Sequence, residues 1–186
     1  MILLVDNNDS FTYNLVALIG RATCEEIEVR DSKSLDIECV ECYSRVIFSP
    51  GAGVPQDFPV MEQILKRYEH TKPILGICLG YQAICQYYGA QLRNLLVVAH
   101  GVGTKIKCEP DSLLFNGIDE MIVGRYHSWV AELLPAELRA TAVDDKGLIM
   151  GVEHITKRVC GVQFHPESYI TENGLSIINN FLYGVH

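Results

Sequence analysis

One cysteine lies in a setting typical of a nucleophile. Cys78 is the centre of Gly-Ile-Cys-Leu-Gly at 76–80, which follows the apolar run 73–75 and precedes a predicted helix over 81–88. Gly-x-Cys-x-Gly at a strand-to-helix junction has the layout of a nucleophile elbow, in which the glycines avoid crowding of a sharp turn and of an approaching substrate. The backbone N–H groups of the first helical turn favour the reactive thiolate. The alternative is a buried cysteine in an ordinary turn.

A base for this thiol is predicted at the end of another apolar run. His165 follows residues 159–164 and opens the sequence His-Pro-Glu-Ser. Pro166 favours an extended backbone at His165, and residues two apart in an extended segment project to the same side. We therefore expect Glu167 to hold the imidazole of His165, as the group that orients a base must. The alternative is a surface turn without a catalytic role.

Four other histidines are weaker candidates. His70 lies in a charged run at a predicted helix end and His186 is the last residue, so we expect both to be solvated. His100 begins a glycine-rich turn. His154 follows Glu153 near a predicted strand end and has no partner that the sequence identifies.

A glycine-rich loop supplies candidate backbone donors. Residues 49–55, Ser-Pro-Gly-Ala-Gly-Val-Pro, place two glycines between prolines, which predicts a rigid loop with exposed N–H groups. The N–H of Gly51, with that of Leu79 after the nucleophile, could form an oxyanion hole. A plain turn is the alternative.

The elements that must position these residues alternate in type. We predict strands over 1–5, 26–29, 45–48 and 74–77, and helices over 11–19, 36–43, 61–68 and 81–88, with Asp9 or Ser10 as the cap of the first. This alternation predicts an α/β fold with a doubly wound, mostly parallel sheet flanked by helices. Residues 6–10, residues 49–55 and Cys78 would then share the edge where ligands bind.

The pattern changes after residue 89. Strands are predicted over 97–107, 121–126, 138–143, 148–153 and 159–164 without long helices between them, and several should pair antiparallel. A final helix is predicted over 173–183. No linker, repeat or low-complexity segment interrupts the sequence, so we expect one domain over residues 1–186.

The composition of the chain indicates which classes of partner it can bind and in which cellular compartment it works. The chain has 186 residues and a net charge of -8, without a run of Lys or Arg, which disfavours binding to nucleic acid or to an anionic membrane. The apolar N-terminal run ends at Asp6 and is too short for a signal peptide or a membrane span. Seven scattered cysteines predict reduced thiols and a cytoplasmic protein. Cys39 and Cys42 form a lone C-x-x-C, which we interpret as a structural pair on a short helix.

Three motifs together resemble the signatures of class I (triad-type) glutamine amidotransferases. They are Gly-Ile-Cys-Leu-Gly-Tyr-Gln at 76–82, Phe-His-Pro-Glu at 164–167 and Ser-Pro-Gly-Ala-Gly at 49–53. Two further runs, Asp-Ser-Phe-Thr-Tyr-Asn at 9–14 and Arg-Tyr-His-Ser at 125–128, resemble the small subunits of anthranilate synthase and of aminodeoxychorismate (para-aminobenzoate) synthase. The resemblance covers essentially the whole chain and implies a flavodoxin-like glutamine amidotransferase domain.

The resemblance also implies roles for individual residues. Cys78 would attack the side-chain amide of L-glutamine, His165 would act as base and then as acid, and Glu167 would orient His165. The positions that match oxyanion donors or glutamine contacts are Gly51, Ala52, Gly53, Leu79, Gln82, Ser128 and Trp129. Ammonia would pass through a channel to a large chorismate-binding subunit, component I. No metal or cofactor is expected in this chain, and Mg²⁺ is expected only in the partner subunit.

Four residues depart from the family's usual pattern. Tyr81 stands where histidine is usual, Ala52 replaces a proline, Trp129 replaces a leucine and Val102 stands where lysine is common. The first three leave the triad and the backbone donors in place, so activity is still expected. Val102 bears on how the large subunit docks.

Two other hypotheses compete with the amidotransferase. One is a free-standing cysteine hydrolase or peptidase on a related sheet, and the other is a non-catalytic regulatory subunit. The run at 9–14 and Gln82 favour the amidotransferase over the first, and the intact triad argues against the second. The residues leave anthranilate and aminodeoxychorismate open as products of the partner.

Overall fold

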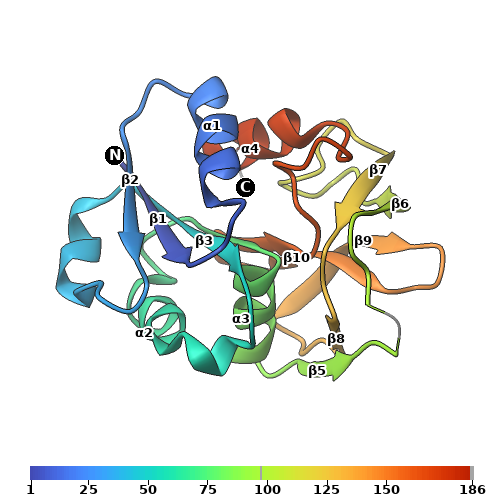
Figure 1. Ribbon diagram of the computed structural model, residues 1–186, viewed down its shortest axis with the longest axis horizontal. Coiled ribbons are helices and arrows are strands. Elements are labelled where there is room, and N and C mark those ends of the chain that lie inside the picture. The colour runs from blue at the N-terminus through green and yellow to red at the C-terminus, as the bar shows by residue number, and fades with distance from the viewer. Residues whose placement is uncertain (97, 185–186) are drawn as a thin grey trace.

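A computed structural model describes residues 1–96 and 98–184 (Figure 1). Strands and helices alternate in its first half: β1 (Ile2–Asn7), α1 (Thr12–Ala22), β2 (Ile27–Asp31), the 3₁₀ helix η1 (Ile37–Cys42), β3 (Arg45–Gly51), the short 3₁₀ helix η2 (Pro55–Asp57), α2 (Pro59–Tyr68), β4 (Ile74–Ile77) and α3 (Leu79–Tyr87). The second half contains β5 (Gln91–Asn94), β6 (Val102–Cys108), β7 (Glu120–Arg125), β8 (Trp129–Glu132), β9 (Leu138–Asp144), β10 (Ile149–His154), β11 (Val159–Val162) and α4 (Gly174–Tyr183).

The sheet has a parallel half and an antiparallel half. Among the described residues, nine strands form one sheet in the order β2-β1-β3-β4-β11-β10-β9-β6-β7, and β5 pairs with β8 in a separate two-stranded sheet. The strands from β2 to β11 run parallel, and the strands beyond β11 continue the sheet antiparallel. The predicted α/β class, with a mostly parallel sheet and a small antiparallel one, is confirmed. Most of the antiparallel strands nevertheless extend the main sheet.

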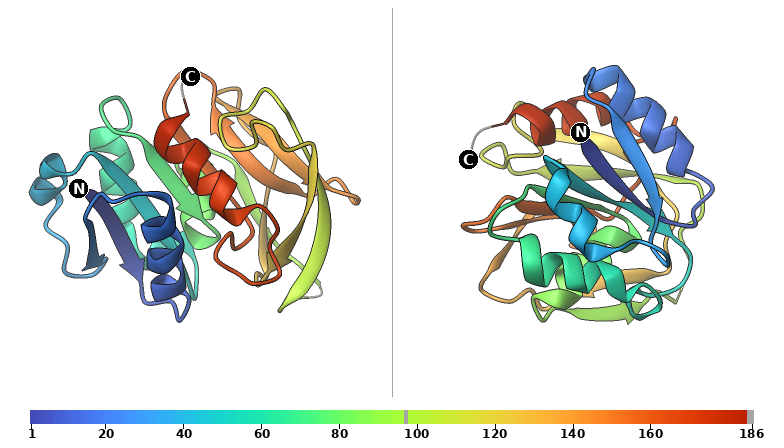
Figure 2. Two further views of the ribbon diagram at one scale, coloured as in Figure 1. Left: turned by 90° about the horizontal axis from the view of Figure 1, so that it is seen from above. Right: turned by 90° about the vertical axis from the view of Figure 1, so that its left-hand side faces the viewer.

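Helices cover both faces of the parallel half (Figure 1 and Figure 2). Ile2 and Leu4 of β1 are buried in one core cluster with residues of α1 and α4, whereas Leu3 and Val5 are buried in another with residues of α2 and α3. This division follows from the pleat, because successive side chains of a strand point to opposite faces. The uninterrupted apolar runs of the parallel strands are therefore buried on both sides.

Several boundaries differ from the sequence-based expectation. Helix α1 begins at Thr12, and Asp9 does not serve as its N-cap: its Oδ1 accepts a hydrogen bond from the N–H of Phe11 at 2.7 Å, just before the helix. The short helix predicted over 36–43 is the 3₁₀ helix η1, capped by the Asp36 side chain. Cys39 and Cys42 lie on η1 and are free and exposed.

Two strands were not anticipated, and two were predicted too long: β11 ends at Val162, before the end predicted at 164, and the other is β6. Strand β5 is short, polar and largely exposed, so it carries no apolar pattern that could reveal it. Strand β8 has four residues and pairs with β5. Strand β6 begins at Val102, after the start predicted at 97. Residue 97 and His186, which was expected to be solvated, lie outside the described residues.

The ends of the parallel strands bring the predicted site loops together. Asn7 at the end of β1 pairs with Gly51 at the end of β3, across a shift in register. Cys78 follows β4 on the same edge. The prediction that these segments share the carboxyl edge of the sheet is confirmed. Within the described ranges, no helix is both long and apolar enough to cross a bilayer, and no group of three or more His, Cys, Asp or Glu could hold a metal ion.

Candidate active site

Cys78 has the backbone conformation of a nucleophile elbow. It lies between β4 and α3 at φ 51 and ψ -98, a region that residues other than glycine rarely adopt. Its N–H donates to the carbonyl of Val162 at 2.9 Å, and its carbonyl accepts from the N–H of Gln82 at 3.0 Å. The turn is thus fixed from both sides, and the thiol lies at the N-terminus of α3 as predicted.

The two glycines beside Cys78 are required by packing within the protein. A Cβ on Gly76 would lie 2.4 Å from the backbone of Gly80, and a Cβ on Gly80 would lie 2.5 Å from the Cβ of Phe48 on β3. Both distances are far below ordinary van der Waals contact. The glycines therefore let α3 approach the sheet closely enough for the sharp turn to form. A side chain at either glycine would therefore clash with the protein's own atoms, and not with a substrate in the pocket.

His165 and Glu167 form a buried pair. The Nδ1 atom of His165 lies 2.7 Å from Oε1 of Glu167, and the two side chains are 3% and 0% exposed. Burial alone would lower the pKa of His165, but the interactions of its ring with Cys78 and with Glu167 outweigh burial and raise this pKa to about 10. The imidazole is therefore protonated at neutral pH. The predicted pairing of His165 with Glu167 is confirmed.

Two aromatic rings enclose the imidazole of His165. The ring of Phe11 lies edge-on to it with centroids 5.3 Å apart, and the ring of Tyr126 does so at 5.0 Å. Phe11 and Tyr126 also contact each other at 5.1 Å. These contacts restrict rotation of the His165 ring. Because Phe11 belongs to the run at 9–14, they also place that run beside the site.

The glycine-rich loop is anchored to the end of β1. The N–H of Asn7 donates to Ser49 Oγ at 2.8 Å, and its side-chain Nδ2 donates to the Ser49 carbonyl at 2.9 Å. A Cβ on Gly51 would lie 2.5 Å from the Leu79 side chain, so the two predicted oxyanion donors belong to adjoining residues. Further along, Gly53 has φ +100, and the N–H of Val54 donates to Asp57 Oδ2 at 3.0 Å.

A cavity of about 350 Å³ opens beside Cys78. The predicted site residues that line it are Gly51, Ala52, Gly53, Cys78, Gln82, Ser128 and Trp129, together with Val54, Tyr126 and His127. Leu79 adjoins this set through Gly51 but does not line the cavity. The cavity thus joins the elbow, the glycine-rich loop and the segment before β8, which are distant in sequence. Its size suits a small-molecule substrate.

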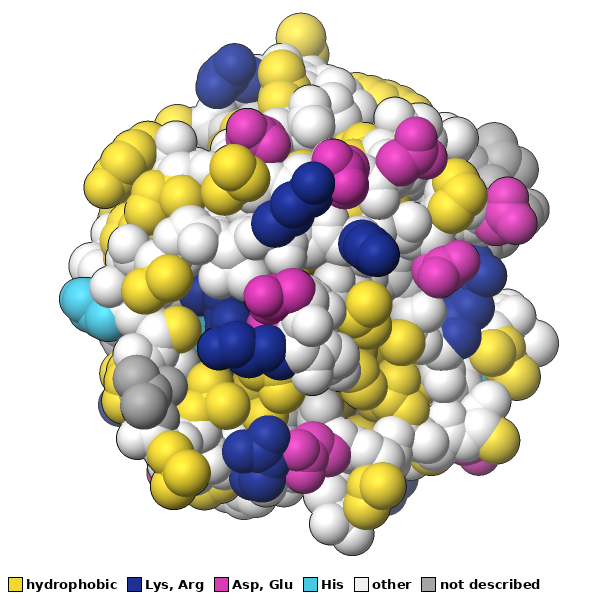
Figure 3. Space-filling view, turned by 90° about the vertical axis from the view of Figure 1, so that its right-hand side faces the viewer, with side chains coloured by type: hydrophobic (Ala, Val, Ile, Leu, Met, Phe, Trp, Pro, Cys, Tyr) yellow, Lys and Arg dark blue, Asp and Glu magenta, His cyan; other side chains and the backbone are white. Residues whose placement is uncertain are grey.

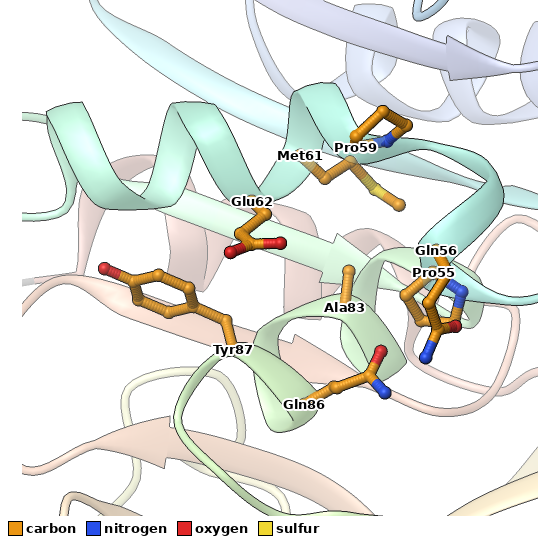
Figure 4. Close-up of a pocket in the computed structure, with 8 residues that line it drawn as sticks. All are labelled: Pro55, Gln56, Pro59, Met61, Glu62, Ala83, Gln86 and Tyr87. Atoms are coloured by element: carbon orange, nitrogen blue, oxygen red, sulfur yellow. The ribbon is translucent and has the colours of Figure 1, made fainter.

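A larger cavity of about 470 Å³ lies between α2, α3 and η2, away from the nucleophile (Figure 4). Its wall includes Gln56, Glu62, Gln86 and Tyr87. None of the residues that line it is a predicted site residue, and Cys78 is not among them. The candidate site is therefore the smaller cavity, because Cys78 lines it and the ring of Tyr126 in its wall packs on His165. His165 and Glu167 themselves do not line this cavity.

His127 is held in one tautomer by a buried ion pair. Arg125, whose Nη1 lies 3.2 Å from Oδ2 of Asp144, donates through Nε to Nε2 of His127 at 3.0 Å. Arginine has no acceptor, so the proton of the neutral imidazole is on Nδ1, which donates to the carbonyl of Trp129 at 3.0 Å. Burial and the charge of Arg125 lower the pKa of His127 to about 3.

Gln163 is a site residue that the sequence patterns did not reveal. Its side chain is fully buried, its Nε2 lies 3.8 Å from Sγ of Cys78, and its Oε1 accepts from Nε2 of Gln82 at 3.3 Å. Gln82 Nε2 also donates to the Trp129 carbonyl at 3.2 Å. Gln163 precedes Phe164 in the same run as His165, but an apolar strand pattern carries no signal for a polar contact with the nucleophile.

The remaining histidines have other environments. The side chain of His70 is 71% exposed, in agreement with the prediction. His100 is exposed and its ring approaches that of Tyr126 at 5.8 Å. His154 is buried and has partners that the sequence did not reveal: its Nδ1 accepts from the N–H groups of Thr156 and Lys157, both at 3.0 Å.

Comparison with known proteins places this site in a family. Residues 3–185 match the model of the family described as glutamine amidotransferase class-I. The anthranilate synthase component 2 of Lactococcus lactis is 41% identical over 98% of this chain and 93% of its own length. That of Pseudomonas aeruginosa is 41% identical over 98% of this chain and 94% of its own length. The chain belongs to the class I glutamine amidotransferases.

A solved structure supports the fold independently. A putative GMP synthase subunit from Thermoplasma acidophilum superposes with a TM-score of 0.88 over 97% of this chain and 91% of its own, at 24% sequence identity. At that identity the likeness concerns the fold alone.

Proposed function

We propose that this chain is the glutamine amidotransferase component of an anthranilate synthase, which hydrolyses L-glutamine and delivers ammonia to a chorismate-using component I. The observation that carries the proposal is the strained elbow of Cys78, which opens into a cavity whose wall residue Tyr126 packs on the buried His165–Glu167 pair. The names of the relatives from L. lactis and P. aeruginosa favour anthranilate over aminodeoxychorismate as the product of the complex.

In the proposed reaction, Cys78 Sγ attacks the side-chain amide carbon of glutamine. The tetrahedral oxyanion accepts hydrogen bonds from the N–H groups of Gly51 and Leu79. His165 gives its proton to the amide nitrogen, the C–N bond breaks and ammonia leaves a glutamyl thioester. Water, deprotonated by His165, then attacks the thioester, and the C–S bond breaks to give glutamate and the free thiolate.

Glu167 keeps the protonation of His165 suited to this sequence of steps. The imidazolium exists before attack, because Glu167 and Cys78 raise the pKa of His165. The carboxylate also fixes Nδ1 as the donor to itself and leaves Nε2 to face the reacting atoms. None of these steps uses a metal or an organic cofactor, so we propose that Mg²⁺ acts only in the partner subunit.

Gln82 presents an acceptor to the substrate. Its amide nitrogen is engaged by the Trp129 carbonyl and by Gln163, so its Oε1 is the atom left for a ligand in the cavity. An acceptor at this point suits the ammonium or amide N–H groups of glutamine. Ser128 and Trp129 line the cavity next to Gln82 and contribute backbone groups.

The partner would dock on a rim of exposed apolar side chains around the cavity. We define this apolar rim as Tyr13, Leu96, Val98, Val102 and Tyr169, all of which are exposed. Each of these residues lies within three positions of a residue that contacts the site. Tyr13 is near Phe11, which packs on His165, and Tyr169 follows the His165–Glu167 pair. Leu96 and Val98 lie beside Leu95 and Ala99, whose N–H groups donate to the carbonyls of Ser128 and His127, and Val102 pairs with Arg125. An exposed apolar rim is typical of a protein interface.

The neighbouring face over β6 and β7 favours a protein partner over nucleic acid. Acidic and basic side chains are interspersed there with apolar ones (Figure 3), and Lys105 pairs with Glu120 across the two strands at 2.7 Å. Nucleic-acid binding requires a continuous basic surface, and this face does not provide one. A cytoplasmic location remains our prediction from the cysteine content.

The proposal is tested by the glutaminase activity of the purified chain. Glutamate release is measured for the chain alone, with an anthranilate synthase component I plus chorismate, and with the large subunit of aminodeoxychorismate synthase plus chorismate. We expect strong stimulation, and anthranilate formed from glutamine, with the first partner. Glutamate release that responds to neither partner would contradict the proposal, as would efficient peptide cleavage by the isolated chain.

A further inference from the structure

A continuous set of hydrogen bonds connects an ion pair in the sheet with Cys78. It begins at Asp144–Arg125, passes through His127 to the Trp129 carbonyl, and continues through Gln82 and Gln163 to Sγ of Cys78. The six residues that contribute side chains are all buried, with exposures from 0% to 8% of the whole residue. The reaction steps above need neither His127 nor Gln163, although both contact groups that take part in them.

The direction of each hydrogen bond is fixed by the chemistry of its donor. Arginine can only donate, so Nε2 of His127 must accept and Nδ1 must donate to Trp129. The amide nitrogen of Gln82 donates to the same carbonyl and also to Oε1 of Gln163. With its oxygen engaged in this way, Gln163 has its amide nitrogen directed at Sγ.

These constraints act differently at two places in the set of hydrogen bonds: at the Trp129 carbonyl, which we call the pocket end, and at Cys78, which we call the nucleophile end. At the pocket end, two donors converge on the Trp129 carbonyl and fix the peptide that lines the cavity. At the nucleophile end, the amide N–H of Gln163 contacts the sulfur and can donate to it once the thiol has lost its proton for attack, and hydrogen bonds to a charged acceptor are stronger. Gln82 belongs to both ends, since it lines the cavity and orients Gln163.

We propose that His127 and Gln163 are positioning residues: His127 fixes the Ser128–Trp129 backbone for glutamine binding, and Gln163, oriented by Gln82, holds the thiolate of Cys78 for attack. Substrate contact with Gln82 is thereby coupled to the geometry of the nucleophile. The predicted effects on glutamine binding and turnover rest on the proposed glutaminase activity. The contact between Gln163 and Cys78 does not, because it is present in the chain itself.

The His127 end is tested with a pair of substitutions measured by glutaminase kinetics with component I bound. His127→Leu removes the donor to Trp129, whereas His127→Asn replaces Nδ1–H by an amide N–H at a similar position. We expect His127→Leu to raise KM for glutamine roughly 10-fold with a smaller change in kcat, as loss of one buried hydrogen bond predicts. His127→Asn should recover most of that loss, and His70→Leu is the exposed control. Equal KM values for the Leu and Asn variants would overturn this role.

The Gln163 end is tested without glutamine turnover. The rate at which iodoacetamide alkylates Cys78 is followed by mass spectrometry in the wild type, in Gln163→Met and in the exposed control Gln63→Met. We expect alkylation to slow roughly 10-fold in Gln163→Met alone, because the thiolate loses a donor. If that variant does not fold, Gln163→Asn replaces it, since its shorter side chain keeps an amide but cannot reach Sγ. Alkylation at the wild-type rate would overturn the role of Gln163.

The coupling itself is tested by a double-mutant cycle. If the two ends act through Gln82, the loss of kcat/KM in the His127→Leu, Gln163→Met double variant should be smaller than the product of the two single losses. A double variant whose loss equals that product would show two independent contacts and would overturn the coupling. Absence of glutamine hydrolysis in the wild type would count against the proposed function alone, because the alkylation measurement does not depend on it.

Discussion

The backbone at Cys78 stores strain where the thiol is presented. A residue other than glycine in such a conformation costs about 1–3 kcal/mol, and it persists only because surrounding contacts hold it. Those contacts are the hydrogen bonds of Cys78 with Val162 and Gln82 and the close packing of Gly80 against Phe48. The strain turns the sulfur toward the cavity and places it near the positive end of α3.

The protonation of His165 leads to a prediction about stability and pH. Its pKa is raised in the folded chain, so its contribution to stability is complete below about pH 6.5 and is lost as the pH rises toward about 10. Glu167→Gln removes one cause of this shift. We therefore expect the free energy of unfolding of the wild type to fall more between pH 6.5 and pH 10 than that of Glu167→Gln, measured by urea denaturation.

The control for this titration is Glu109→Gln, a substitution at an exposed glutamate. Its unfolding free energy should follow the wild-type dependence on pH. If Glu167→Gln shows the same slope as the wild type across this range, the pair does not hold the proton that the structure assigns to it.

Sequence patterns identified the site residues to different degrees. Cys78, His165 and Glu167 were predictable because each lies in a short segment whose glycines or proline limit the backbone. Gln163 was not, since it contacts Cys78 across 85 positions of sequence, and no local pattern encodes such a contact. His127 was not, because its tautomer depends on Arg125, which is held by Asp144, 19 positions further along the chain. A polar side chain that is fully buried at the end of a strand becomes informative only when its partners are known.

At the scale of elements, β7 positions both the segment that carries His165 and part of the wall of the cavity beside Cys78. The N–H of His165 donates to the Gly124 carbonyl at 3.1 Å, and the N–H of Glu172 donates to the Ile122 carbonyl at 2.9 Å. The segment that carries His165 and Glu167 therefore lies along the outer edge of β7, which would otherwise be unpaired. Beyond Arg125 the same strand leads directly into the residues that line the cavity.

Close packing of α3 on the sheet gives a prediction with a matched control. Gly80→Ala would place a Cβ 2.5 Å from Phe48, so we expect it to destabilise the fold by about 1–3 kcal/mol and to reduce glutaminase activity. Gly20→Ala in α1 meets nothing within 4 Å and should stabilise by about 0.5–1 kcal/mol, because alanine is a better helix former. Thermal unfolding of the two variants measures both effects. Equal stability of Gly80→Ala and the wild type would contradict the packing argument.

Element prediction succeeded where the apolar pattern was strong. Strand β4 has its predicted bounds, and α2, α4 and the buried strands lie within a few residues of theirs. The misses, β5 and β8, are four-residue strands that stabilise each other rather than a large core. Their pairing depends on a contact between residues about 40 positions apart, which a local pattern cannot supply.

At the scale of the whole molecule, the apolar rim distinguishes the active-site edge from the opposite edge. Tyr169 is 94% exposed and lies two residues after Glu167, so its side chain contributes little to the fold. Ile155 is 58% exposed but lies between β10 and β11, at the opposite edge of the sheet. This difference in location allows docking to be separated from general surface effects.

We predict that Tyr169→Lys weakens binding of component I by roughly 10-fold or more and reduces stimulation of glutamate release, as loss of an aromatic interface anchor would. Ile155→Lys should leave both unchanged. Binding is measured by titration with component I, and thermal unfolding of the isolated variants verifies that each folds. If the Ile155 variant were impaired and the Tyr169 variant were not, the partner would dock elsewhere.

The strand order could be predicted only in part. Parallel pairing of the first strands follows from their alternation with helices, but the addition of β10, β9, β6 and β7 to the same sheet does not. That extension brings β7 and the segment before β8 to the active-site edge, and it completes the cavity from the second half of the chain. The cavity beside Cys78 is thus a property of the whole fold, whereas the elbow is local.

The most direct test of the account compares two nitrogen sources in the complex with component I and chorismate. Cys78→Ala should abolish anthranilate formation from glutamine and leave formation from added ammonia at the wild-type rate, because only the glutaminase step uses the thiol. Cys42→Ala, at an exposed cysteine on η1, should retain both activities. Continued use of glutamine by Cys78→Ala at the wild-type rate would contradict the assignment of Cys78 as the nucleophile and, with it, the account of this chain as a glutamine amidotransferase.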